Sequence, residues 1–170
     1  DGTTVNAREG FKKEKFFDGD NHTIYNFSCS QTKYPSFFGV LNGTVQNLVF
    51  DGVTLNETEK DSSIGTIGGF SGTNNIQAIV RNVTVKNVKI QTKGLSTGSG
   101  SGFGAVAGQT QGEGNNFFGV KVSGFTINGT DPANLPRNIG GFIGYVRGSG
   151  TYRDCHVEDV SISGSRCLGG

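Results

Sequence analysis

The chain has 170 residues, a formal net charge of +1, and 29 glycines against 3 prolines, while hydrophobic residues make up 33% and charged residues 17%. Glycine costs about 1 kcal/mol per helical site relative to alanine, so this composition excludes a helical bundle. The 13 phenylalanines need a core and argue against disorder. We therefore predict an all-β protein with many tight turns, with no nucleic-acid footprint and no membrane span.

Residues 1–15 precede any repeating pattern and carry a short basic cluster, Lys12, Lys13 and Lys15. We expect this segment to form an N-terminal cap or a strand donated to a neighbour. The sequence contains no Met and opens on no signal peptide. For this reason we expect the chain to be a processed or partial piece of a longer product.

Residues 16–170 contain five copies of one eight-residue pattern with four apolar slots. The copies are 22–29 (HTIYNFSC), 48–55 (LVFDGVTL), 83–90 (VTVKNVKI), 120–127 (VKVSGFTI) and 155–162 (CHVEDVSI). The first, third, sixth and eighth slots hold an apolar residue or cysteine, except for His22 in the first. Because successive strand residues point to opposite faces, we expect these four slots, His22 included, to face a core.

The fifth slot interrupts the strict alternation of each copy. It holds Asn26, Gly52, Asn87, Gly124 and Asp159. These residue types adopt positive φ or a bent backbone at the least cost. We predict a corner at this slot, which lets the side chains on both of its sides point inward.

A second motif with paired glycines precedes the last three copies. It begins at Ile67 (IGGFSG), Phe103 (FGAVAG) and Ile139 (IGGFIG), at a spacing of 36 residues, and Leu168 reopens it. A shorter FFG, at 37–39, precedes the second copy. Paired glycines in a strand mark bends or close approach of backbones. We expect one apolar residue of each motif to fill the core: Phe37, Phe70, Val106 and Phe142.

This repeat of about 36 residues predicts a right-handed β-helix, or β-solenoid, of about five coils. The coils are expected near residues 16–36, 37–66, 67–102, 103–138 and 139–170. Strands of adjacent coils would pair about 4.8 Å apart, so that equivalent slots stack into columns. Exposed strand edges at the two ends invite pairing, so we expect either self-association into a head-to-tail filament or continuation of a larger chain.

Three segments resemble proteins with the GLUG motif. They are FFDGDNHTIYNFSC, SFFGVLNGTVQNLVFDGVTL and GGFIGYVRGSGTYRDCHVEDVSISG. In that family an F-D-G-N-x-H-T-I-x-N coil precedes a G-L-F-G coil and then G-G-L-V-G … I-x-N-C-x-V-x-G repeats. The resemblance covers roughly residues 16–170 and departs by using Phe where the motif usually has Leu, and by long variable loops. It implies a large extracellular or surface β-helical protein, such as an adhesin or a non-catalytic region of a secreted protease.

The N-x-S/T sequons favour a secreted protein, a setting in which cysteines can pair. The sequons are at Asn21, Asn26, Asn42, Asn56, Asn82 and Asn128, which we expect to carry N-linked glycans. Asn26 at a corner and Asn82 before a strand can instead be structural, and Asn82 is the weakest candidate. Cys155 and Cys167 can form a disulfide, which leaves Cys29 buried and free or bonded outside this chain.

Few carboxylates are candidates for catalysis by an enzyme that acts on polysaccharides. They are Asp18, Asp20, Asp51, Asp154 and Asp159. Turn and corner roles account for all of them, and Asp18 with Asp20 are too few to specify calcium. His156 lies in an outward slot, and neither histidine has the cysteine neighbours that zinc requires. We therefore expect no catalytic site, no metal and no cofactor.

The sequence thus predicts a secreted, N-glycosylated, non-catalytic β-solenoid at the cell surface or outside the cell. It would be a structural or adhesive element, with a carbohydrate or cell-surface ligand among its partners. The alternative is an accessory β-helical region of a secreted polysaccharide-acting enzyme or protease.

Overall fold

The computed structural model describes residues 11–30, 33–72, 77–95, 100–129, 137–163 and 168–169. Every regular element within these ranges is a β-strand, and the strands pair in parallel. The prediction of an all-β protein is confirmed. None of the described residues form a helix long and apolar enough to cross a membrane.

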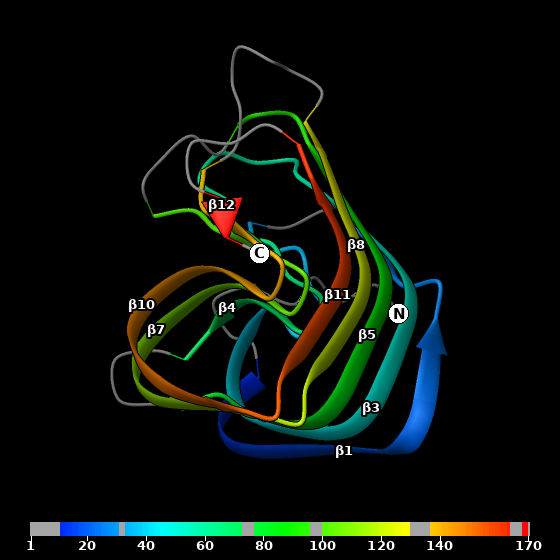
Figure 1. Ribbon diagram of the computed structural model, residues 1–170. Coiled ribbons are helices and arrows are strands. Elements are labelled where there is room, and N and C mark those ends of the chain that lie inside the picture. The colour runs from blue at the N-terminus through cyan, green and yellow to red at the C-terminus, as the bar shows by residue number, and fades with distance from the viewer. Residues whose placement is uncertain are drawn as a thin grey trace, which may run out of the picture.

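The strands form one large sheet and one small one (Figure 1). They are β1 (Phe11–Tyr25), β2 (Ser28–Cys29), β3 (Val40–Asn56), β4 (Gly68–Ser71), β5 (Ile79–Thr92), β6 (Phe103–Gly104), β7 (Ala107–Phe118), β8 (Lys121–Gly129), β9 (Ile139–Gly140), β10 (Ile143–Arg153), β11 (His156–Ile162) and β12 (Leu168–Gly169). Strands β1, β3, β5, β8 and β11 pair in that order, and β3, β4, β7 and β10 pair in a second row. The small sheet has the order β12-β9-β6.

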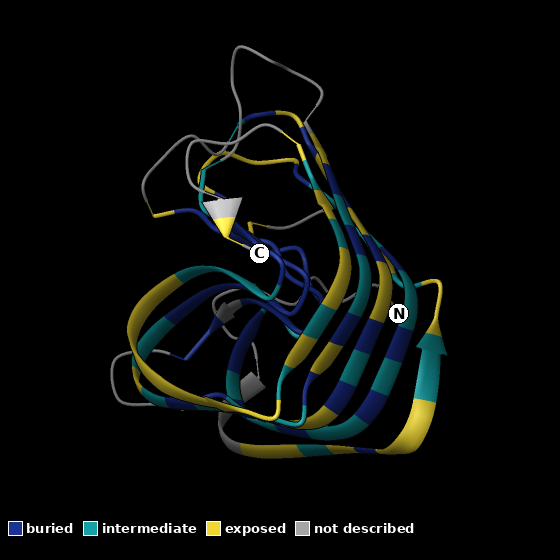
Figure 2. Cartoon of the chain, in the orientation of Figure 1, coloured by how far each residue is buried: buried dark blue, intermediate teal, exposed yellow. Residues whose placement is uncertain are grey.

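The register of the first row places equivalent slots of the repeat opposite one another. Phe50 of β3 pairs with Val85 of β5, and Val85 pairs in turn with Val122 of β8. Val122 pairs with Val157 of β11, so the third-slot residues of these four strands form one column. In the three central copies, all slot residues are between 0% and 2% exposed. These columns form the core, and Figure 2 shows their dark bands alternating with exposed positions along the strands.

Each eight-residue copy contains one corner with positive φ and is preceded by another. The fifth-slot residues have φ of 53° at Asn26, 77° at Gly52, 53° at Asn87, 77° at Gly124 and 54° at Asp159, which confirms the predicted corner. A second corner, which the sequence interpretation missed, lies just before the first slot. Its φ values are 58° at Asn21, 51° at Asn47, 49° at Asn82, 61° at Gly119 and 55° at Asp154. The corners delimit the short stretch of each strand that lies flat against the core.

The glycine motif of the third coil begins three residues earlier than predicted. Phe103 faces Ile64 on one side and Ile139 on the other, so the motif begins at Ile64 instead of Ile67. The amide of Ile67 donates to the carbonyl of Val106, which makes Ile67 the equivalent of Val106 in place of the predicted Phe70. Ile64 and Ile67 are fully buried, whereas the side chain of Phe70 lies outside the described part. The error arose because "IGTIGG" and "IGGFSG" overlap and both fit the glycine pattern.

Phenylalanines close the core near the first repeats. The ring of Phe37 meets those of Phe38, Phe27 and Phe50 at centroid distances of 4.8, 5.4 and 5.3 Å, with steep interplanar angles. Edge-to-face pairs of this kind contribute about 0.5–1.5 kcal/mol each beyond the area they bury. These large phenylalanine rings therefore fill the core space near the first repeats.

The first repeat departs from one prediction. His22 was predicted to face the core, but it is exposed, and its Nδ1 lies 2.9 Å from the carbonyl oxygen of Gly19. The reason is that β1 is the edge strand of the large sheet, so no described strand covers its outer side. Strand β1 also begins at Phe11 and pairs with β3 of the same chain from that residue on, across the expected boundary at residue 15.

Candidate functional site

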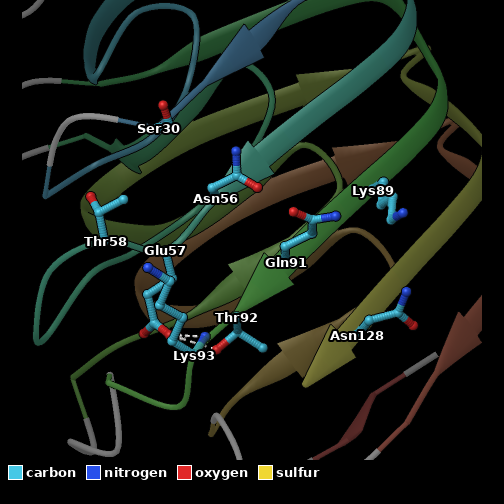
Figure 3. A pocket seen from close by; sticks show the side chains of 9 residues that line it. All are labelled: Ser30, Asn56, Glu57, Thr58, Lys89, Gln91, Thr92, Lys93 and Asn128. Carbon is cyan, nitrogen blue, oxygen red and sulfur yellow. Dashed lines mark hydrogen bonds between the residues drawn. The ribbon is translucent and has the colours of Figure 1, made fainter. Parts of the chain in front are cut away.

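A polar pocket lies where strands β2, β3, β5 and β8 leave the core. Its volume is about 560 Å³. It is lined by Ser30, Asn56, Glu57, Thr58, Lys89, Gln91, Thr92, Lys93 and Asn128. Figure 3 shows these side chains coming from neighbouring strands around the pocket.

One polar residue per repeat forms a row along this pocket. Asn56 pairs with Gln91, and Gln91 pairs with Asn128. Cys29 pairs with Leu55, which places Ser30 in the same row as Asn56. Each of these residues directly follows the eighth, buried slot of its copy, where strand alternation turns the side chain away from the core. The fold therefore stacks amide and hydroxyl groups at the spacing of adjacent strands.

Glu57 forms the inner wall of the pocket and is fully buried. Its Oε2 accepts a hydrogen bond from Thr92 Oγ1 at 2.6 Å and from the amides of Lys93 at 2.9 Å and Leu95 at 3.1 Å. The amide of Gly94 donates to Thr92 Oγ1 at 3.0 Å. One carboxylate oxygen thus binds the turn that follows β5. A buried charge requires such partners, because its desolvation is otherwise strongly unfavourable.

Two buried acceptors at the pocket have no partner. Within the described ranges, neither Glu57 Oε1 nor Asn56 Oδ1 receives a hydrogen bond. Buried polar atoms in native proteins are nearly always paired, and an unpaired one costs about 1–3 kcal/mol. Both oxygens are shielded from solvent, so each carries the cost of an unpaired buried acceptor.

Two lysines carry positive charge at the pocket. Lys89 and Lys93 are both exposed, and in the part of the chain that the structure describes neither ammonium group forms an ion pair. Together with Glu57 they give the lining a formal excess of positive charge. An anionic group at the mouth would therefore be attracted, most strongly at low salt.

The structure places most predicted sequons on the surface. Asn21, Asn26, Asn82 and Asn128 are exposed, and Asn42 and Asn56 are half-buried. Asn26 and Asn82 are corner residues with positive φ, and Asn82 Nδ2 donates to Asn47 Oδ1 at 3.3 Å. The structural role considered for these two is therefore present. Asn56 and Asn128 both line the pocket. Whether any sequon carries a glycan stays a prediction.

The predicted acids stand at turns or bond to an adjacent strand. Asp20, Asp154 and Asp159 have positive φ, and Asp51 Oδ1 accepts from Asn87 Nδ2 at 2.7 Å. No group of three or more His, Cys, Asp or Glu residues suited to a metal occurs in the described ranges. His156 is exposed, as predicted, with Nε2 3.3 Å from Glu158 Oε2.

Asp18 is the predicted acid with a perturbed pKa. The amide of Asp20 donates to Oδ1 at 2.9 Å, Gln46 Nε2 to Oδ2 at 2.7 Å and Asn47 Nδ2 to Oδ1 at 3.1 Å. The Asp20 amide first, then the two side chains, hold the pKa of the Asp18 carboxyl below its ordinary value of 3.8. The carboxylate therefore ties β1 to β3 at the edge of the sheet.

The two described cysteines pack against the core, as predicted. Cys29 and Cys155 are free and half-buried. Cys155 Sγ donates to the carbonyl of Phe117 at 3.4 Å. Cys167 lies outside the described residues, so the pairing of Cys155 with Cys167 stays a prediction.

The chain has a structural relative of known coordinates. It is similar to a 1.30 Å crystal structure described as a "putative immunoglobulin A1 protease" from Bacteroides ovatus. The two share 19% sequence identity and a TM-score of 0.50, over 91% of this chain and 68% of that chain. A likeness at this identity shows a shared fold alone. No family model and no curated protein matches the sequence, so the resemblance to the GLUG motif family stays a prediction.

The pocket was not predicted from the sequence, although its row left a signal. The residue after the eighth slot is polar in every copy: Ser30, Asn56, Gln91, Asn128 and Ser163. Asn56 and Asn128 also lie in sequons, and glycosylation is the only role that we predict for them from the sequence. Glu57 gave no signal, because nothing in its neighbours indicates that a carboxylate there would be buried.

Proposed function

We propose that the chain is a right-handed β-solenoid that acts as a non-catalytic structural or adhesive element of a secreted protein. The register of β3, β5, β8 and β11 carries this proposal, because it stacks equivalent slots of successive repeats into continuous apolar columns. In such a stack each repeat is stabilised by its neighbours, which suits a rigid, elongated support. The acids give further support, because Asp20, Asp154 and Asp159 stand at positive-φ turns and Asp51 bonds to the next repeat.

Secretion and glycosylation are supported by the positions of the sequons. Exposed Asn21 and Asn128 are accessible to a glycosyltransferase, whereas exposed Asn82 already donates a hydrogen bond. The experiment is intact-mass analysis of the chain secreted from eukaryotic cells, before and after a glycosidase that removes N-glycans. We expect a loss of mass that Asn21→Gln and Asn128→Gln each reduce. An unchanged mass would remove the secretory argument.

Self-association or continuation of a larger chain is supported by apolar side chains on the outermost strands. Phe16 and Tyr25 of β1 are 61% and 69% exposed, and Val146 and Tyr152 of β10 are 49% and 42% exposed. We propose that these surfaces stack head to tail on a second copy or on further repeats. Negative-stain microscopy of the purified chain tests the first possibility. Strictly monomeric particles at high concentration would leave only the second.

The alternative function is an accessory region of a secreted protease or polysaccharide-acting enzyme. The fold likeness to a structure named for an immunoglobulin A1 protease favours the protease form. This alternative predicts that the purified chain binds immunoglobulin A1 without cutting it, which surface plasmon resonance and gel analysis would measure. The scaffold proposal predicts neither binding nor cleavage, and cleavage would contradict both.

A further inference from the structure

We propose that the polar pocket beside Glu57 binds an acidic sugar, that is, a saccharide unit that carries a carboxylate. The proposal deepens the adhesive role given above and rests on it for the biological source of the ligand. The binding itself follows from the pocket and is independent of secretion or filament formation.

The amides that line the pocket select a ligand with hydroxyl groups. Gln91 and Asn128 are exposed at the pocket, and each amide offers both donors and an acceptor. A sugar hydroxyl also donates one hydrogen bond and accepts others, so it can bond to either end of such an amide. A pocket of about 560 Å³ has the volume of a small-molecule site.

The row of polar side chains extends this recognition along the molecule. Asn56, Gln91 and Asn128 project from three successive repeats, and Figure 3 shows them along one side of the pocket. An amide offers both a donor and an acceptor, which matches the paired hydroxyls of a pyranose ring. An extended saccharide can therefore make one polar contact per repeat.

The charges select an anion among the sugars. Lys89 and Lys93 line the pocket without a described ionic partner, and they would attract a carboxylate. They would also repel a cationic ligand. A small anion such as inorganic phosphate would meet the lysines but offers no ring hydroxyls to the amides of the row. A carboxylate joined to a hydroxyl-bearing ring can bond to both sets of groups.

The sequons at Asn56 and Asn128 dictate how the protein is made for the test. A glycan on either residue would occupy the mouth of the pocket. The full chain is therefore produced in the bacterial cytoplasm, which adds no N-glycans, and its fold is checked by circular dichroism. Because the preparation needs no secretion, failure of sugar binding would not bear on the glycosylation test of the proposed function.

The experiment is calorimetric titration with three probes: trigalacturonate, its methyl ester and sialyllactose. The methyl ester has the same ring hydroxyls and no charge. We expect at least one of the two acids to bind. If trigalacturonate binds, its methyl ester should bind at least about tenfold more weakly. Which of the two acids binds more tightly distinguishes a uronic acid from a sialic acid as the ligand.

Variants locate the binding. The double variant Lys89→Gln/Lys93→Gln should weaken the acid by about tenfold and leave the ester unchanged. Gln91→Ala, at another exposed position, should weaken both. Lys121→Gln is the matched control, since Lys121 is exposed on β8 but does not line the pocket. The proposal is overturned if no acid binds, if trigalacturonate and its ester bind equally, or if the pocket variants behave as Lys121→Gln does.

Discussion

Glu57 and Thr92 belong to successive repeats, 35 residues apart, and their side chains meet at 2.6 Å in a fully buried contact. The same carboxylate oxygen accepts from the amides of Lys93 and Leu95. Glu57 therefore joins the end of β3 to the turn after β5 and holds the wall of the pocket in place.

Replacing Glu57 by alanine should destabilise the protein strongly. It removes the oxygen that accepts from the Thr92 hydroxyl and two amides, at about 1–3 kcal/mol for each buried group that stays unpaired. Glu57→Gln retains one carbonyl oxygen and should be milder. Urea denaturation measures the difference, with Glu113→Ala as the exposed control. If Glu57→Ala and the control have the same free energy of unfolding, the hydrogen bonds of Glu57 make no net contribution to stability.

The corner at Asn87 should tolerate glycine better than alanine. Its φ of 53° costs an ordinary L-residue about 1–2 kcal/mol, whereas glycine adopts such a conformation freely. We expect the free energy of unfolding to fall in the order wild type, Asn87→Gly, Asn87→Ala. Lys86→Ala, at the exposed position next to the corner, should have little effect. A reversed order for Gly and Ala would refute the corner.

Gly108 should be intolerant of any side chain. A Cβ there would overlap the amide nitrogen of Ile64 and lie 2.7 Å from the carbonyl oxygens of Gly69 and Gly102. These are backbone atoms of adjacent repeats, so Gly108→Ala should cost about 3 kcal/mol, the upper end for overpacking. Gly100→Ala is the control, because no described atom lies within 4 Å of its added Cβ. Thermal melts of the two variants should differ clearly, and similar melts would contradict this packing.

Asp18 should make the stability depend on pH in acid. Its folded pKa is lowered below 3.8 by the Asp20 amide, Gln46 and Asn47, so the folded state favours the carboxylate. Its contribution is therefore complete above 3.8 and is lost as the pH falls through the lower folded value. Asp18→Asn should remove this part of the pH dependence. A carboxyl NMR titration measures the pKa directly, and Gln46→Ala should raise it toward 3.8.

The sequence by itself determined the repeat, its inward slots and one of its corners. Alternation of apolar residues and the preference of Asn, Gly and Asp for positive φ are local properties, so Val85, Val122 and Asn87 could be placed from their immediate neighbours. The tertiary structure decided what depends on the stacking of repeats. It placed the glycine motif at Ile64, because two overlapping patterns fit equally well and only pairing with Phe103 separates them.

The stacking also decided the exposure of His22 and the pocket. His22 fits an inward slot, but burial needs a covering strand, and β1 lies at the sheet edge. Glu57 is buried because a turn of the next repeat supplies its three donors, a contact between residues far apart in the chain. Periodicity reports which face of a strand is apolar. It does not report which groups a neighbouring repeat brings to the end of that strand.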